Sequence, residues 1–285
     1  MSTITLVLND EQIGKLKSLF ASEIVSKTPP YALFQIRTEN CVITVYESKK
    51  AVFQGNDAQI YASSFQPKNS DYYAHVGSDE VGTGDYFGPV CVCATYVDEK
   101  YADILDKLNI CDSKQLSDED IMKIAPTLME TIPYSLLVCD NARYNKVHAI
   151  HNMNGVKAML HNQALVNLSK KIAMPQLIVI DQFTPEKSYY HYIRSAEQIV
   201  DHIHFETKAE NKFPAVACGS IIARYAFLVS LDSLNRHYDF TFVKGAGAQV
   251  DECAARFIRQ FGEKELGNVA KLHFKNTAKA LSLID

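Results

Sequence analysis

The 285-residue sequence lacks long apolar segments. It contains no uninterrupted apolar run of about 18 residues, which is the length that a membrane-spanning helix needs. Its N-terminus has no basic stretch followed by an apolar one, because MSTITLVLNDEQ turns acidic after a few residues. These absences predict a cytoplasmic protein that does not bind membranes.

The sequence also lacks CxxC pairs, although it has seven cysteines. Cys91 and Cys93 lie two residues apart in the apolar run PVCVCATYV, so they would face the same side of a strand. That position suits small buried hydrophobic side chains. We therefore expect reduced thiols in the protein core.

An excess of basic residues is missing too. There are 29 Lys and Arg against 33 Asp and Glu, which gives a net charge of −4 and an isoelectric point near 6.1. This argues weakly against nucleic acid as a ligand, because most nucleic-acid-binding proteins present a basic surface. Residues 1–66 carry six charges of each sign, so the negative excess belongs to the remainder.

The length favours one catalytic domain and a small accessory domain. Residues 1–66 read as a strand, a helix and two β-rich runs, which predicts a small α+β module. The segment 67–73 contains a Pro, an Asn and a Ser between periodic stretches and is the expected linker. Residues 74–285 would then form the catalytic domain.

Strand-like and helical stretches alternate beyond the linker, which predicts an α/β fold. The expected strands are HVGSDEV, FGPVCVCATYV, YSLLVCD and PQLIVID. Helices are expected from Ser117, whose acidic first turn suits an N-cap, over GVKAMLHNQALVNLSKKIA, and over 214–238 as the last strong helix.

Two acids, Asp79 and Glu80, end an apolar strand and are followed by Gly82, Thr83 and Gly84. Glycines let a backbone approach a phosphate or sugar closely, so this segment can bring a metal site and a nucleic-acid backbone together. Taken alone it is equally consistent with an ordinary turn after a solvated acid pair. It is not a P-loop, because no Gly-Lys-Ser/Thr follows.

Two further acids favour a functional site over an ordinary turn. Asp181 ends the buried strand LIVID, and Glu210 lies just ahead of the long helix over 214–238. Either acid alone could be a helix cap or a surface charge, but α/β sheets place their sites at such strand ends. Since neighbours on a regular strand face opposite sides, we expect the strand to end or twist at Asp79 and Glu80.

Four long blocks in order carry a family resemblance: SDEVGTGDYFGPV, DSKQLSDE, NARYNKVHAIHNMNGVKAMLHNQAL and TKAENKFPAVACGSIIARYAF. From about residue 74 onward the sequence resembles the type 2 ribonuclease H family, and within it the ribonuclease HIII branch. The resemblance implies an RNase H-like mixed sheet flanked by helices, with a four-carboxylate site. By position these acids are Asp79, Glu80, Asp181 and Glu210.

Two details favour the HIII branch over the related ribonuclease HII. The fourth acid is Glu210 where HII has Asp, and Gly82-Thr83-Gly84 stands where HII has Gly-Arg-Gly. The branch also carries a small TATA-binding-protein-like domain before the catalytic one, which residues 1–66 match in layout.

The resemblance implies an endonuclease that hydrolyses the RNA strand of RNA/DNA hybrids by two-metal-ion catalysis, leaving 3′-hydroxyl and 5′-phosphate ends. Mg²⁺ is the expected cofactor, with Mn²⁺ as an alternative, because carboxylates are hard oxygen ligands. The four acids partly explain the negative net charge. We expect a monomer with no obligate protein partner.

Substrate contacts are expected from the Gly82–Gly84 loop to the 2′-hydroxyl and from Lys114 to a phosphate. Further basic residues could also contact the hybrid, and these are Arg37, Lys49, Lys50, Lys271, Lys275 and Lys279. Two alternatives stay open: an HII-type enzyme that incises at single ribonucleotides in duplex DNA, and a non-catalytic nucleic-acid-binding protein. Bare carboxylates repel phosphate, which counts against the second.

Overall fold

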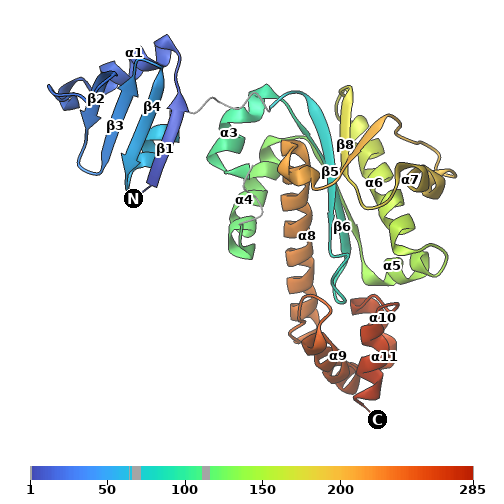
Figure 1. Cartoon of the computed structure of the whole chain (residues 1–285). Helices are drawn as coiled ribbons and strands as arrows, with labels where there is room; N and C mark the ends of the chain where they lie inside the picture. Colours follow the sequence, from blue (N-terminus) through green and yellow to red (C-terminus); the bar gives the residue numbers. More distant parts are fainter. Residues whose placement is uncertain (1, 64, 66–71, 111–115, 285) are drawn as a thin grey trace. The chain divides into compact units, whose positions relative to one another are not determined.

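The computed structural model describes residues 2–63, 65, 72–110 and 116–284. The chain forms two compact units, Met1–Ser70 and Asp71–Asp285 (Figure 1). We describe each unit by itself.

The N-terminal unit is a four-stranded antiparallel sheet in the order β1-β4-β3-β2, packed with two helices. Its elements are β1 (Ser2–Val7), α1 (Asp10–Leu19), η1 (Ala21–Glu23), β2 (Ala32–Arg37), β3 (Cys41–Tyr46), β4 (Lys50–Gly55) and α2 (Ala58–Ser63). A capping box of Asn9 and Gln12 starts α1. Leu16 of α1 and Ala62 of α2 join Ile43 and Phe53 in an apolar core.

The second unit is built on a five-stranded mixed sheet in the order β7-β6-β5-β8-β9. The elements up to β8 are β5 (His75–Val81), β6 (Val90–Val97), η2 (Glu99–Tyr101), α3 (Ala102–Lys107), α4 (Asp118–Thr131), β7 (Tyr134–Cys139), α5 (Asn141–His148), α6 (Met153–Ser169) and β8 (Leu177–Asp181). The rest are α7 (Glu186–Ile193), β9 (Ile203–Glu206), η4 (Ala209–Asn211), α8 (Pro214–Tyr238), α9 (Ala248–Phe261), α10 (Glu263–Val269) and α11 (Lys275–Ser282). β5, β8 and β9 run parallel, and β6 is antiparallel to its neighbours β5 and β7. The α/β fold with a mixed sheet is confirmed.

Helices cover both faces of this sheet (Figure 1). α8 packs on β5 and β6 from one side, and α6 packs from the other. α8 lies unusually close to β5, because a Cβ on Gly77 would stand 2.2 Å from the backbone nitrogen of Val216. Glycine at position 77 therefore lets the start of α8 rest directly on the strand.

The 25-residue helix α8 is long and apolar enough to span a membrane by length and composition alone. Within this protein, 67% of its most apolar window is buried against the sheet and neighbouring helices. Its start is fixed by Pro214 in the first turn and by the Thr95 hydroxyl, which donates to the carbonyl of Ala215 at 2.6 Å. α8 is thus the central core helix of the second unit.

Some sequence expectations need correction. α8 is not the last strong helix, because α9, α10 and α11 follow it. β4 and α2 of the N-terminal unit were not expected either. The helix starting at Ser117 is confirmed as α4, with a capping box formed by Ser117 and Asp120. The six cysteines in the described residues are all buried and free, and Cys111 lies outside them.

Candidate active site

The site forms where two central strands stop pairing. β5 stays paired with β6 as far as Val81, but its parallel ladder with β8 ends at Ser78 and Ile180. Asp79 and Glu80 follow Ser78 on β5, and Asp181 follows Ile180 on β8. The end of the ladder therefore brings three acids to one opening, as expected at the carboxyl ends of parallel strands.

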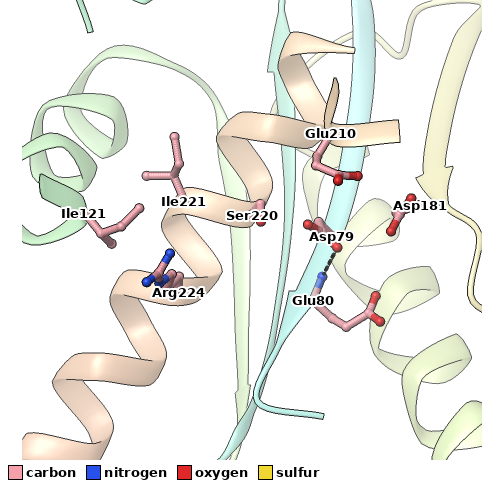
Figure 2. Close-up of a pocket in the computed structure, with 8 residues that line it drawn as sticks. All are labelled: Asp79, Glu80, Ile121, Asp181, Glu210, Ser220, Ile221 and Arg224. Atoms are coloured by element: carbon pink, nitrogen blue, oxygen red, sulfur yellow. Dashed lines mark hydrogen bonds between the residues drawn. The ribbon is translucent and has the colours of Figure 1, made fainter. Parts of the chain in front are cut away.

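A cavity of about 410 Å³ lies at this opening. It is lined by Asp79, Glu80, Ile121, Asp181, Glu210, Ser220, Ile221 and Arg224 (Figure 2). All four acids from the sequence analysis are thus brought together. The Gly82–Gly84 loop is not part of this lining, and Lys114 lies outside the described residues.

Asp79 faces α8. Its Oδ1 accepts a hydrogen bond from the backbone N–H of Glu80 at 2.7 Å, and its carboxylate also interacts with the Ser220 side chain. Burial, followed by the negative charge of Glu80, raises the pKa of Asp79 to about 8. The metal-free site therefore disfavours the negative charge of Asp79.

Glu80 points to the opposite side of β5, toward α6. Lys157 forms an ion pair with its Oε1, and His161 Nε2 lies 2.8 Å from its Oε2. Burial alone would raise the pKa of Glu80, but these two partners outweigh it and lower the pKa. β5 continues to Val81, so the strand does not end at the acid pair and the two side chains take opposite faces. The other expected possibility, a twist of the strand at these residues, stays a prediction.

Asp181 is hydrogen-bonded to the short turn that carries Glu210. The Asp181 Oδ1 accepts the backbone N–H of Ala209, the first residue of η4, at 2.9 Å. Lys208 just before it has a left-handed backbone with φ of 55°, which directs the chain back toward β8. Burial raises the pKa of Asp181 first, and the charges of Glu210 and Glu80 raise it further.

The donor set fits a hard divalent cation. Four carboxylates line one cavity, and the raised pKa values of Asp79 and Asp181 reflect burial and negative charge that a cation would offset. Across the described part of the chain, no three His, Cys, Asp or Glu side chains already converge as a metal-binding group. One reason is that Lys157 and His161 bind the Glu80 carboxylate on the α6 side of the strand.

Arg224 forms the opposite end of the cavity and was missed by the sequence analysis. Its Nε and Nη2 donate to Asp118 Oδ1 at 2.9 and 2.6 Å, and its Nη1 donates to the Leu116 carbonyl at 3.2 Å. The available signal was its position one helical turn after Ser220, in an otherwise apolar part of α8. The cavity thus has an acidic end and a basic end.

The two glycines of the Gly82–Gly84 loop differ. Gly82 is buried with φ of +93°, and a Cβ there would stand 2.2 Å from the Pro89 carbonyl oxygen. Gly84 is exposed, with open space where a Cβ would be. Gly82 is therefore needed for the turn, whereas Gly84 leaves the backbone accessible.

A buried lysine anchors the end of this loop. Lys271 has no exposed surface, and its Nζ donates to the carbonyls of Asp85 at 2.8 Å and Gly88 at 2.5 Å. The prediction that Lys271 contacts a hybrid is therefore wrong. Lys275 and Lys279 are exposed on α11.

Comparison with known proteins decides the family. The family model described as Ribonuclease HII matches residues 76–277, and a domain of unknown function matches residues 3–75. Ribonuclease HIII of Bacillus pumilus is 41% identical, with 98% of this chain and 99% of that protein covered, and ribonuclease HIII of Bacillus cereus is 40% identical, with 99% of each covered. The chain belongs to the ribonuclease HIII family.

Solved structures agree with this assignment. Bst-RNase HIII in complex with Mn²⁺ is 39% identical and superimposes with a TM-score of 0.73, covering 100% of this chain and 99% of that one. RNase H3 of Aquifex aeolicus, at 23% identity and a TM-score of 0.58, shares the fold over 95% of this chain and 100% of its own. As a ribonuclease HIII family member, the protein is a metal-dependent endonuclease that acts on the RNA strand of RNA/DNA hybrids.

Proposed function

We propose that the four cavity carboxylates hold two Mg²⁺ ions and that cleavage leaves 3′-hydroxyl and 5′-phosphate ends. The observation that carries this proposal is the convergence of Asp79, Glu80, Asp181 and Glu210 on one cavity from β5, β8 and η4. Mn²⁺, which is bound in the Bst-RNase HIII structure, is the alternative ion.

The protein's own groups set the positions of the ligands. Ser220 and the Glu80 amide orient Asp79, while the Ala209 amide orients Asp181. When bound, divalent ions would activate a water as nucleophile and stabilise the charge that develops on the phosphate and leaving oxygen. Because these ligands lie on strands and a short helix held by hydrogen bonds, little reorganisation is needed during the reaction.

Arg224 and the glycine loop are our candidates for substrate contacts. The Arg224 guanidinium lies at the end of the cavity away from the acids and can donate to a phosphate oxygen while keeping its bonds to Asp118. The accessible backbone at Gly84 suits a hydrogen bond to the 2′-hydroxyl, which distinguishes RNA from DNA. Lys114 remains a proposed phosphate contact.

The N-terminal unit, with a boundary near residues 67–73, would hold the substrate. Arg37 on β2 and Lys50 on β4 have exposed side chains that can neutralise phosphates. Lys49 is less suited, because it pairs with Asp10 at 2.8 Å. In this proposal one chain supplies both binding and cleavage, in the cytoplasm, with no partner protein.

The decisive experiment is cleavage of a labelled RNA/DNA hybrid with Mg²⁺, Mn²⁺ or EDTA, with end-group analysis of the products. We expect metal-dependent nicking of the RNA strand that leaves 5′-phosphates. A DNA duplex with one embedded ribonucleotide should be cut more slowly than the hybrid. Preferred incision at the single ribonucleotide would favour the HII-type activity, and products with 2′,3′-cyclic phosphates would exclude the proposed mechanism.

A further inference from the structure

Lys157 and His161 are the two basic side chains of α6, and both are buried toward Glu80 of β5. Lys157 is 7% exposed and His161 is fully buried, and they lie one helical turn apart. Burying a lysine is costly unless its ammonium group has a close partner. Both residues have the same partner, Glu80.

These contacts use both oxygens of the Glu80 carboxylate. Lys157 pairs with Oε1. His161 holds Oε2, and because an ionised carboxylate only accepts, the His161 Nε2–H is the donor. Its Nδ1 then accepts the Ser78 hydroxyl at 2.8 Å. In Figure 2, Glu80 lies at one end of the acid group and Glu210 at the other.

Phe183, just after β8, contacts both Lys157 and His161. Its ring lies 4.0 Å from Lys157 Nζ and stacks on His161, with centroids 5.3 Å apart. Phe183 follows Asp181 by two residues, so Lys157 is held between the ring and Glu80. A cation over an aromatic face gains further stabilisation when it is desolvated, which helps to explain this buried lysine.

We propose that Lys157 is a positioning residue whose ammonium neutralises Glu80 until a divalent cation takes over that charge. This inference rests on the proposed function, in which Glu80 is a metal ligand. Four carboxylates around one cavity repel one another, and Lys157 allows them to stay together in the metal-free enzyme. The consequence is weaker metal binding, because the cation must compete with Lys157 for Glu80.

The proposal is tested by Lys157→Met and Lys157→Gln, which remove the charge and keep much of the side chain. Free Mn²⁺ is measured by electron paramagnetic resonance while the ion is titrated into the substrate-free full chain. We expect the dissociation constant for Mn²⁺ to fall roughly tenfold, and the melting temperature in EDTA to fall, because Glu80 loses a partner. An unchanged or weaker Mn²⁺ affinity would overturn the proposal.

Matched variants separate this effect from a change in net charge or packing. Lys170→Met removes one charge from an exposed position at the end of the same helix, about 20 Å from Lys157, and should leave Mn²⁺ affinity and melting temperature unchanged. Lys157→Arg keeps the charge, so its Mn²⁺ affinity should stay near that of the unmodified protein. Tenfold tighter binding in either variant would contradict the proposal.

Glu80→Gln distinguishes failure of this inference from failure of the proposed function. Loss of cleavage and weaker Mn²⁺ binding in Glu80→Gln are expected, and normal cleavage would reject Glu80 as a ligand. Should the single Lys157 variants not fold, Glu80→Gln with Lys157→Met removes both charges. This pair should regain a melting temperature in EDTA close to that of the unmodified protein, because no unpaired charge stays buried. A double variant that still melts well below the unmodified protein in EDTA would contradict the proposal that Lys157 is buried in order to pair with Glu80.

Discussion

The two compact units differ in the polar groups that they bury. In the described part of the N-terminal unit the buried polar side chains are Gln35 and Thr44, which bond to each other at 2.8 Å. The described part of the second unit buries four Asp or Lys side chains, namely Asp79, Lys157, Asp251 and Lys271. Burying such groups costs stability, and two of the four serve the active site, because Asp79 lines its cavity and Lys157 pairs with Glu80. The N-terminal unit can be stable without any of them.

The largest effect should come from removing the charge of Asp79 or Asp181. Asp79→Asn and Asp181→Asn keep the side-chain shape but weaken metal binding, which is worth several kcal/mol in the transition state. We expect kcat for hybrid cleavage to fall on the order of 10³-fold, while the thermal unfolding curve in EDTA stays cooperative. Turnover near that of the unmodified enzyme in either variant would remove that residue from the site.

A chain starting at Asp71 tests whether the two units separate binding from chemistry. Loss of phosphate contacts such as Arg37 and Lys50 should raise KM about tenfold and flatten its salt dependence by roughly one unit of slope for each contact. We expect kcat at saturating hybrid to change little. The measurement is steady-state cleavage at two salt concentrations, after circular dichroism has shown that the shortened chain folds. An unchanged KM and salt slope would make the N-terminal unit dispensable for binding.

Lys271→Met tests the cost and benefit of a buried charge away from the acids. Loss of its bonds to Asp85 and Gly88 should destabilise the fold by about 1–3 kcal/mol. Burial lowers the pKa of Lys271 to about 8 in the folded protein, against 10.5 in the unfolded chain. Between these two pH values Lys271 is protonated in the unfolded chain but largely neutral in the folded protein, so the free energy of unfolding rises with pH.

The advantage of the unmodified protein over Lys271→Met should therefore grow across that range, as measured by urea unfolding at pH 7.5 and 9.5. Lys275→Met, at an exposed position, is the control and should show no such growth. A difference that is constant with pH would mean that Lys271 carries its charge without penalty.

The smallest effect should come from the buried pair in the N-terminal unit. Gln35→Leu together with Thr44→Val removes both partners, so the free energy of unfolding should change by less than about 1 kcal/mol and kcat should not change. Thr44→Val alone leaves the Gln35 amide without its acceptor and should cost more than the double change. Urea unfolding of the three proteins decides this, and a double variant less stable than the single one would contradict it.

Local patterns predicted the two strands that carry three of the acids and the helix that follows the fourth, but not the short helix η4 on which Glu210 lies. The apolar run before Asp79 and the run LIVID before Asp181 give β5 and β8, and the Pro and small residues after Glu210 give the start of α8. The order of the strands in the sheet and the residue at which β5 and β8 stop pairing depend on contacts between distant segments. Neither could be derived from local patterns.

The sequence failed where tertiary packing overrides a residue's usual preference. Lysines are rarely buried, so Lys271 was expected at the surface and Lys157 was not considered. The helix around Lys157 was recognised from its apolar residues, but the sequence offers no local sign that Glu80 lies beside it. The spacing of Lys157 and His161, four residues apart, shows only that two basic residues share one face of the helix.

The position of α8 in the chain affects how the protein is made. The ribosome releases β5 and β6 long before residues 214–238 emerge to cover them. Met1–Ser70 is a compact unit with an apolar core of its own and can fold during synthesis, whereas the sheet of the second unit keeps an apolar face open until translation is nearly complete. Chaperones that bind nascent chains are therefore expected to engage this stretch, and a ribosome stalled before residue 214 should release an aggregation-prone fragment.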